Sequence, residues 1–184
     1  MLQDLLARIA RALDQAEVPY MVIGGQAVLA HGFTRLTDDI DITLGVAPEQ
    51  LSQIIDVILE AGLVSLVDDA FVAETLVLPC IDKETDVRVD LIFSFAGYER
   101  EALKRVQKID VGAYSVGFAS VEDVIIHKLV AGRPRDIEDV NQLLIRHAKT
   151  INRVYITGWL DSFSQLLGLE LVTTFTRLLA DASS

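Results

Sequence analysis

Aspartates at three positions carry the clearest chemical signal in the sequence. Asp39 and Asp41 alternate with apolar residues, so in a strand both carboxylates point to one side, about 6.5–7 Å apart along the chain. Carboxylates held this close repel each other unless a cation lies between them, and Mg²⁺ is the first candidate. Asp90 lies in a second alternating stretch, over 86–94. If the two strands are neighbours, the three carboxylates could hold two metal ions about 3.5–4 Å apart, which suits in-line displacement at phosphorus.

A glycine pair upstream favours this interpretation over the simpler one, in which the acidic side chains are only solvated surface groups. Gly24 and Gly25 follow a short strand over 20–23 and open a helix over 26–31. Glycine lets backbone N–H groups approach a phosphate closely, and a helix N-terminus adds positive charge. The sequence contains neither the lysine-bearing P-loop nor the G-x-G-x-x-G pattern, which argues against ordinary ATPases and dinucleotide-binding enzymes.

The elements that position these residues follow from hydrophobic periodicity and from helix breakers. Their order predicts an α+β fold, a small mixed β-sheet flanked by helices with a helical C-terminal part. We expect a core over 1–119 and a helical part over 120–184 packed on it, with a soft boundary. The expected strands cover 20–23, 39–44, 63–67, 71–78, 86–94, 108–111 and 114–118. The expected helices cover 1–17, 26–31, 48–61, 98–106, 120–131, 136 onward, 152–167 and 169–182.

Composition narrows the class of protein. The 184 residues include 16 basic and 27 acidic side chains, for a net charge of −11, and 51% are hydrophobic. The negative charge disfavours a protein whose main role is to coat nucleic acid, and the apolar content suffices for a core. Cys80 is the only cysteine, so the chain can form neither an internal disulfide nor a cysteine zinc cluster. Because no stretch suits a signal peptide or a membrane span, we expect a soluble, cytoplasmic protein without a membrane partner.

The ordered set of motifs resembles the nucleotidyltransferase superfamily, which has the DNA polymerase beta-like fold. Thirteen residues separate Gly24-Gly25 from Asp39-Ile-Asp41, and the strand that carries Asp90 follows later. The fuller pattern GG-x-A-x-x-x-HG-x-x-R-x-T-x-DID is similar to small bacterial members, among them the abortive-infection type IV toxin nucleotidyltransferases. Downstream, the lysine and the R-D-x-x-D helix of that branch are matched by Lys128 and by Arg133-Pro-Arg135-Asp136-Ile-Glu-Asp139.

This resemblance implies a nucleotidyltransferase core over 1–119 that uses Mg²⁺, or Mn²⁺ in its place. The enzyme would move a nucleoside monophosphate from an NTP such as ATP to a hydroxyl group and release pyrophosphate. Asp39, Asp41 and Asp90 would bind the metal, and Asp90 could also help to deprotonate the acceptor hydroxyl. Asp136 or Asp139 would orient a catalytic Lys128 or touch the nucleotide. The other residues implied at the nucleotide are Gly24 and Gly25 at the β and γ phosphates, Arg35, Thr37, and Arg135 from the helical part.

The acceptor and the broader role have several alternatives. The acceptor could be a tRNA end, a protein hydroxyl or a small molecule such as an aminoglycoside-like antibiotic, and the negative net charge tilts this choice away from RNA. A different class of function is a weakly catalytic or non-catalytic module of a toxin–antitoxin pair. The apolar C-terminal helices leave room for an antitoxin partner or a homodimer. A metal-dependent phosphohydrolase would use the same carboxylates but lacks a histidine-rich ligand set.

Some nearby residues allow two interpretations. Arg35 could bind phosphate or pair with Asp38, and for His31 we favour a structural hydrogen bond over catalysis. A basic cluster could dock tRNA or another polyanion, although a solvated helix face is the simpler interpretation; it consists of Arg100, Lys104, Arg105 and Lys108. An aromatic repeat every four residues is typical of a core or dimer stripe; it consists of Tyr155, Trp159 and Phe163.

Overall fold

The computed structural model describes residues 2–33, 37–94 and 96–182, and within these stretches the chain is an α+β fold with a mixed seven-stranded sheet. The predicted fold class is confirmed. Contacts divide the chain into two compact units, Met1–Ala30 with Arg35–Ala119 and His31–Thr34 with Ser120–Ser184. Along the described stretches no helix is both long enough and apolar enough to cross a membrane.

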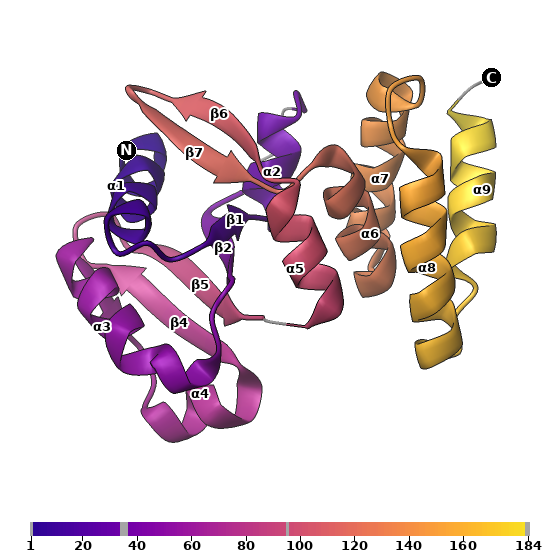
Figure 1. Ribbon diagram of the computed structural model, residues 1–184. Helices are drawn as coiled ribbons and strands as arrows, with labels where there is room; N and C mark the ends of the chain where they lie inside the picture. The colour runs from indigo at the N-terminus through magenta and orange to yellow at the C-terminus, as the bar shows by residue number, and fades with distance from the viewer. Residues whose placement is uncertain (1, 34–36, 95, 183–184) are drawn as a thin grey trace. The chain divides into compact units, whose positions relative to one another are not determined.

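The sheet of the first unit has the two aspartate strands near its centre. Its order is β3-β4-β5-β2-β1-β7-β6 (Figure 1). Strand β2 is parallel to β5 on one side and antiparallel to β1 on the other, so it is hydrogen-bonded along both edges. The strands are β1 (Tyr20–Val22), β2 (Asp39–Leu44), β3 (Leu63–Ser65), β4 (Val77–Asp82), β5 (Val87–Phe93), β6 (Gln107–Val111) and β7 (Tyr114–Phe118).

Alternation along β2 and β5 separates a buried apolar face from a polar face. Ile40 and Ile42 of β2 lie opposite Val89 and Leu91 of β5, and none of the four is more than 1% exposed. Burial of this face stabilises the sheet and fixes its register, because a slip of one residue would turn the aspartates into the core. The helices of this unit are α1 (Leu2–Gln15), α2 (Gly24–Ala30), the short 3₁₀ helix η1 (Pro48–Gln50), α3 (Leu51–Glu60), α4 (Asp69–Thr75) and α5 (Gly97–Lys104).

The strand expected over 71–78 is wrong in its first half. Residues Asp69–Thr75 form helix α4, and only from Val77 onward does the chain run as strand β4. Asp68 is the N-cap of α4, and its carboxylate accepts a hydrogen bond from the backbone N–H of Phe71 at 3.0 Å. The cap therefore decides the local structure over the strand-like composition of the segment.

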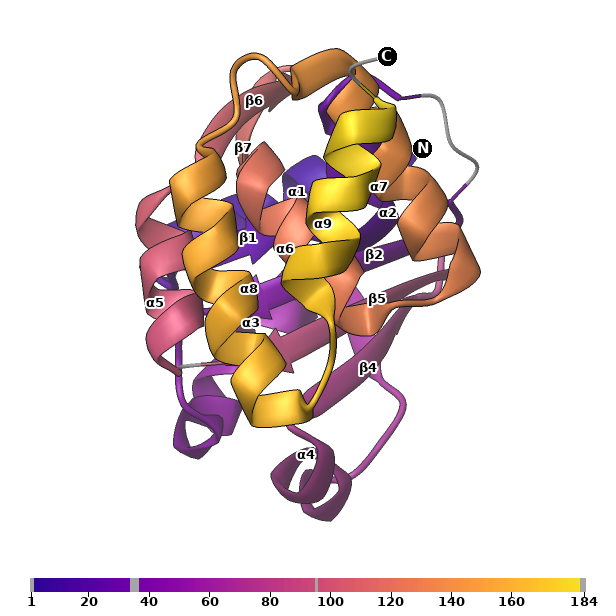
Figure 2. The ribbon, with the colours of Figure 1, turned by 90° about the vertical axis from the view of Figure 1, so that its right-hand side faces the viewer.

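The second unit is helical, as expected, and its helices begin at polar caps. Ser120 caps α6 and accepts a hydrogen bond from the N–H of Asp123 at 3.2 Å, and Gly132 ends that helix with φ +64°. Helix α7 begins at Pro134 rather than at Asp136, because a proline suits the first helical position. Figure 2 shows the last two helices side by side. The helices are α6 (Val121–Ala131), α7 (Pro134–His147), α8 (Arg153–Leu167) and α9 (Leu171–Asp181).

Candidate active site

Two neighbouring strands bring the predicted carboxylates together on one face of the sheet. In the parallel register of β2 and β5, Asp41 lies directly opposite Asp90, and Asp39 lies opposite Arg88. Because alternate residues of a strand share a face, Asp39, Asp41, Arg88 and Asp90 all project from the polar face. The strand neighbourhood on which a three-carboxylate site depends is therefore present.

The glycine pair packs closely against these acidic residues. Strand β1 ends at Val22, and the next backbone N–H, of Ile23, donates to the Asp41 carbonyl oxygen at 2.9 Å. Gly24 then has φ +63°, and a Cβ atom at this position would collide with the Asp41 carboxylate. A Cβ atom at Gly25 would lie 2.5 Å from Thr37 Oγ1. Glycine at both positions therefore permits a close approach that a side chain would block.

The Asp39 carboxylate is held by a neighbour on its own chain. Thr37 Oγ1 donates a hydrogen bond to Asp39 Oδ1 at 2.6 Å, and Gln26 Nε2 of α2 donates to the Asp39 carbonyl oxygen at 3.3 Å. Asp39 is exposed, whereas Gln26 is buried. Thr37 thus contacts both Gly25 and Asp39, and it links the glycine turn to the first aspartate.

The donor set suits a hard divalent cation. Among the described residues, the buried Oδ1 atom of Asp90 has no hydrogen-bond partner, and Arg88 Nη2 lies 3.8 Å from it. A buried carboxylate oxygen without a donor is costly, and a bound cation would compensate for it. In the described part of the chain, however, no three His, Cys, Asp or Glu side chains form a group that could hold a metal ion. In the strand register, Asp41 and Asp90 are the directly opposed pair.

Arg88 is a component of this face that our sequence analysis missed. Its side chain is 60% exposed, and in the register it lies opposite Asp39 and two residues before Asp90. The alternation that places Asp90 on the polar face also places Arg88 there, so the signal was present in the sequence. The guanidinium group of Arg88 partly neutralises the Asp90 carboxylate beside it.

In the helical unit, Lys128 is enclosed by two carboxylates. Its Nζ lies 2.8 Å from Asp136 Oδ1 and 2.9 Å from Asp139 Oδ2, and its side chain is only 6% exposed. Arg133 Nε donates to the other oxygen of Asp136 at 2.6 Å. Burial on its own would raise the pKa of Asp136, but hydrogen bonds from Arg133 and Lys128 outweigh it and hold the pKa below its ordinary value. Arg135, in contrast, is exposed.

Other residues singled out from the sequence have mainly structural surroundings. Arg35 lies outside the described residues. His31 is buried, and its carbonyl oxygen is 3.0 Å from His147 Nε2. In the aromatic repeat, Tyr155 donates a hydrogen bond to buried Asp123 at 2.8 Å.

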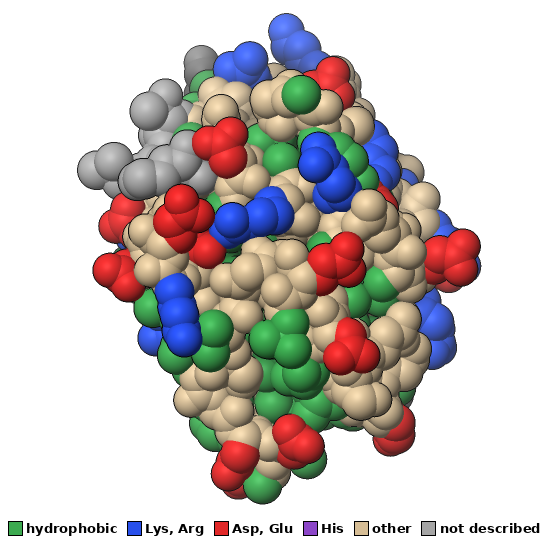
Figure 3. Space-filling view, turned by 90° about the vertical axis from the view of Figure 1, so that its left-hand side faces the viewer, with side chains coloured by type: hydrophobic (Ala, Val, Ile, Leu, Met, Phe, Trp, Pro, Cys, Tyr) green, Lys and Arg blue, Asp and Glu red, His purple; other side chains and the backbone are tan. Residues whose placement is uncertain are grey.

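The basic cluster is interrupted by acidic partners. Lys104 pairs with Glu101 at 2.6 Å, and Lys108 pairs with Asp14 at 3.5 Å. These ion pairs weaken the attraction of the cluster for a polyanion, which favours the solvated interpretation. On the face that Figure 3 displays, Lys and Arg side chains are likewise interspersed with Asp and Glu.

Several solved structures, nucleotidyltransferases among them, share this fold. ANT(2″)-Ia, solved with adenylyl-2″-tobramycin, has a TM-score of 0.63 and 17% identity, with 90% of this chain and 98% of that chain covered. JHP933 from Helicobacter pylori has a TM-score of 0.54 and 18% identity, with 98% and 88% covered. The lincosamide antibiotic adenylyltransferase LnuA, solved with lincomycin, has a TM-score of 0.55 and 15% identity, with 76% and 94% covered. At these identities the likeness shows the fold alone.

A family comparison goes further than the fold. Among curated proteins, none matches the sequence. The family model described as "Nucleotidyltransferase of unknown function (DUF6036)" matches residues 1–156, which include both aspartate strands, the glycine pair and Lys128. The resemblance to nucleotidyltransferases is confirmed, and membership of the toxin-like branch stays a prediction. The chain therefore belongs to the DUF6036 family and is a nucleotidyltransferase.

Proposed function

We propose that the protein transfers a nucleoside monophosphate from an NTP to a hydroxyl group of a small acceptor molecule and releases pyrophosphate. The observation that carries this proposal is the register that sets Asp41 opposite Asp90, with Gly24 packed against the Asp41 carboxylate. Carboxylates that share a sheet face beside a glycine turn offer oxygen ligands next to backbone N–H groups. That combination suits a metal-bound triphosphate.

Asp39, Asp41 and Asp90 are the residues that would hold Mg²⁺, or Mn²⁺ in its place. The uncompensated Oδ1 of Asp90 and the all-oxygen donor set support this assignment. When bound, the cation would neutralise negative charge on the triphosphate and on the phosphorus that is attacked. We propose that Thr37 orients Asp39 through its hydrogen bond to Oδ1.

The chain's own groups would then orient the reactants. The backbone N–H groups of Gly24 and Gly25 would bind the β and γ phosphates. Arg35 and Thr37, which follow in the sequence, would also contact the nucleotide. The acceptor hydroxyl oxygen forms a bond to the α-phosphorus, and the bond from that phosphorus to the bridging oxygen breaks as pyrophosphate leaves. The hydroxyl proton would pass to Asp90, whose buried Oδ1 accepts no other hydrogen bond in the described structure.

For the helical unit, the resemblance to nucleotidyltransferases implies roles at the nucleotide. Arg135 is exposed and would neutralise phosphate charge. Lys128 could neutralise phosphate charge only if it left Asp136 or Asp139. While it is paired with both, we propose that it organises the helical unit. Asp136 would orient both Lys128 and the N-terminus of α7.

The acceptor that we favour is a small, cationic molecule with a hydroxyl group. The net charge of −11 attracts cations and repels tRNA. Two structural neighbours were solved with small molecules of this kind: ANT(2″)-Ia with adenylyl-2″-tobramycin, and the lincosamide antibiotic adenylyltransferase LnuA with lincomycin. The label-transfer assay described next also includes a protein hydroxyl and a tRNA end as competing acceptors.

The experiment is a label-transfer assay with each α-³²P-labelled NTP and Mg²⁺ or Mn²⁺. The acceptor panel is an aminoglycoside set, total tRNA and cell lysate. Asp41→Asn and Asp90→Asn should each abolish transfer while leaving the thermal unfolding curve intact. Asp110→Asn, the same substitution at an exposed position of β6, is the matched control and should retain full activity. If the wild-type protein binds no NTP in calorimetry with either metal, the proposal is wrong.

A further inference from the structure

Arg88 is the one basic residue on the strands that carry or flank the carboxylates. Strands β2, β4 and β5, which all lie in the first compact unit, contain no other Lys or Arg. In the register of β5 with β2, Arg88 lies opposite Asp39, and along β5 it precedes Asp90 by two residues. Because alternate residues of a strand share a face, its guanidinium group projects from the same face as the carboxylates.

The contact between Arg88 and Asp90 is loose for an ion pair. Arg88 Nη2 lies 3.8 Å from Asp90 Oδ1, and the two side chains are 60% and 32% exposed. A charge-assisted hydrogen bond would bring the two atoms to about 2.7–2.9 Å. Arg8, in the same unit, forms such a bond, with its Nη2 2.7 Å from Oδ1 of buried Asp82. An exposed pair at the longer distance contributes little to folding, so Arg88 can leave Asp90 without disturbing the sheet.

The Asp90 oxygen in this pair is poorly satisfied. Oδ1 is buried, and no described residue donates a hydrogen bond to it. A buried carboxylate oxygen without a donor is costly, and a guanidinium group at 3.8 Å compensates for only part of that cost. A divalent cation carries twice the charge and binds such an oxygen directly. Because like charges repel, the divalent cation and the guanidinium group would compete for Oδ1.

We propose that Arg88 is the counter-ion that Asp90 exchanges for the divalent cation, and that the released guanidinium group binds the NTP. When Asp90 binds the cation, Arg88 loses its partner and is repelled by the new positive charge. The triphosphate then offers it phosphate oxygens, which the planar guanidinium group can bind in pairs. This inference rests on the proposed function, because it requires the metal at Asp90 and the NTP on this face of the sheet.

The exchange would make the binding of the two ligands cooperative. In the free protein, Arg88 opposes the metal, so it lowers the affinity for the metal alone. With the NTP bound, the guanidinium group has another partner, and its opposition to the metal ends. By linkage, the NTP then raises the affinity for the metal, and the metal raises the affinity for the NTP by the same factor.

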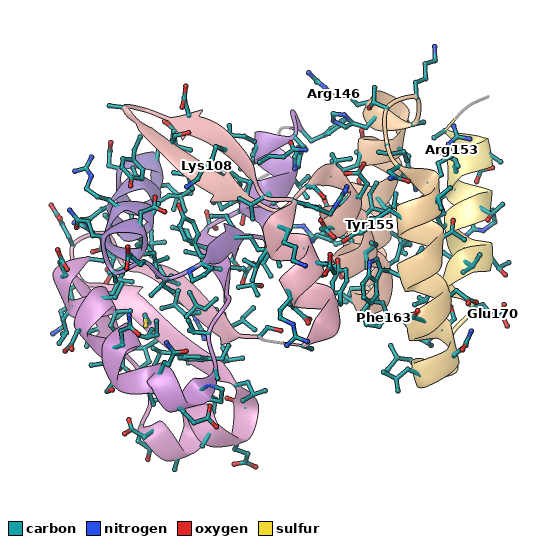
Figure 4. All side chains as sticks on the ribbon, in the orientation of Figure 1. Lys108, Arg146, Arg153, Tyr155, Phe163 and Glu170 are labelled. Carbon is teal, nitrogen blue, oxygen red and sulfur yellow. The ribbon has the colours of Figure 1, made fainter. Side chains whose placement is uncertain are left out.

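The chain offers a matched control in the same unit. Lys108 Nζ lies 3.5 Å from Asp14 Oδ1, and these side chains are 52% and 36% exposed, so the pair resembles that of Arg88 and Asp90. Lys108 lies on β6 (Figure 4), and three strands separate β6 from β5, a distance of about 19 Å at the usual strand spacing. Salt screens charges this far apart. Lys108→Gln therefore removes one positive charge without affecting Asp90.

The first measurement uses Mn²⁺ alone, titrated into the metal-free protein and followed by electron paramagnetic resonance. Arg88→Gln should bind Mn²⁺ about three- to tenfold more tightly than the wild type, because the competing charge is gone. Lys108→Gln should match the wild type. Arg88→Lys keeps the charge and should stay within about twofold of the wild type.

The second measurement repeats the Mn²⁺ titration with α,β-methylene analogues of the NTPs, which cannot release pyrophosphate. For the wild type, the analogue that binds should tighten Mn²⁺ binding. The ratio of the Kd values for Mn²⁺ without and with this analogue should fall at least about threefold in Arg88→Gln. An unchanged ratio would overturn the inference, because the guanidinium group would then remain beside Asp90 when the NTP is bound.

The outcomes separate this inference from the proposed function. If the wild type transfers nucleotide but Arg88→Gln binds Mn²⁺ no more tightly than Lys108→Gln, only the inference is overturned. The inference is also overturned if neither the wild type nor Arg88→Gln binds Mn²⁺. If Arg88→Gln tightens Mn²⁺ binding and lowers the ratio but the wild type transfers no nucleotide to any acceptor, the proposed function fails and the exchange at Asp90 is supported.

Discussion

Replacing Lys128 with methionine tests whether the ion pairs inside the helical unit hold that unit together. Methionine keeps the length and apolar stem of the side chain, so the change removes chiefly the ammonium group. Breaking a buried pair by removing one partner costs about 3–5 kcal/mol, because the remaining charge stays buried. Asp136 keeps Arg133 at 2.6 Å, so the lower end applies, about 3 kcal/mol. For a chain of this size that corresponds to a fall in Tm of about 6–12 °C.

The assay is urea unfolding followed by far-UV circular dichroism, with a calorimetric Tm as a second measurement. Lys149→Met, the same substitution at an exposed lysine, should change the unfolding free energy by less than about 0.5 kcal/mol. The double variant Lys128→Met/Asp139→Asn should lose less unfolding free energy than the summed losses of its two single variants. The difference should be at least about 1 kcal/mol, because the double variant buries less unpaired charge. Strict additivity, or a Lys128→Met variant as stable as Lys149→Met, would refute the reasoning. Transfer activity measured far below both Tm values then shows whether Lys128 also acts on the nucleotide.

Three further predictions address the glycine turn and the second unit. Gly24→Ala should lower the transfer rate at least about 100-fold, because the added Cβ atom displaces the Asp41 carboxylate. Gly97→Ala is the control, since a Cβ atom there meets nothing within 4 Å and should leave the rate unchanged. Equal rates for the two variants would contradict the packing argument. Because the pKa of Asp136 is lowered on folding, its stabilisation is present above the ordinary value of about 3.9 and is lost as pH falls through the lower folded value. Urea unfolding from about pH 6 to about pH 2.5 should therefore show this loss, and Asp136→Asn should remove that part of the profile; an unaltered profile would disprove the assignment. Tyr155→Phe should cost about 1.5–3 kcal/mol in thermal unfolding, because buried Asp123 loses a donor at 2.8 Å, and a neutral result would show that the bond contributes little.

Local patterns predicted most of the elements that carry the site, because their signals are complete within a few residues. The alternation of Asp39–Leu44 matches strand β2 residue for residue, and Ser120 marks the start of α6. Pairing between strands is a different kind of information. That β5 is parallel to β2, and that Asp41 rather than Asp39 lies opposite Asp90, depends on packing between segments far apart in the chain.

Helix α4 shows why a short element is hard to recognise. Phe71, Val72, Thr75 and Val77 have strand-like composition, and seven residues are too few for helical periodicity to appear. No glycine marks its end, since Leu76 itself takes the left-handed conformation with φ +59°. Asp68 is the available signal, but capping residues and turn residues are the same types, so it does not by itself distinguish the start of a helix from a turn.

The hairpin of β6 and β7 offers a site at which this enzyme can be labelled. β6 is an outermost strand, and β7 separates it from β1, which leads into the glycine turn. Gly112, between the two strands, has φ +60° and open space around the position of a Cβ atom. A fluorophore or epitope inserted beside Gly112 would therefore extend into solvent from a strand that carries no catalytic group. Such a label leaves every proposed ligand in its natural surroundings.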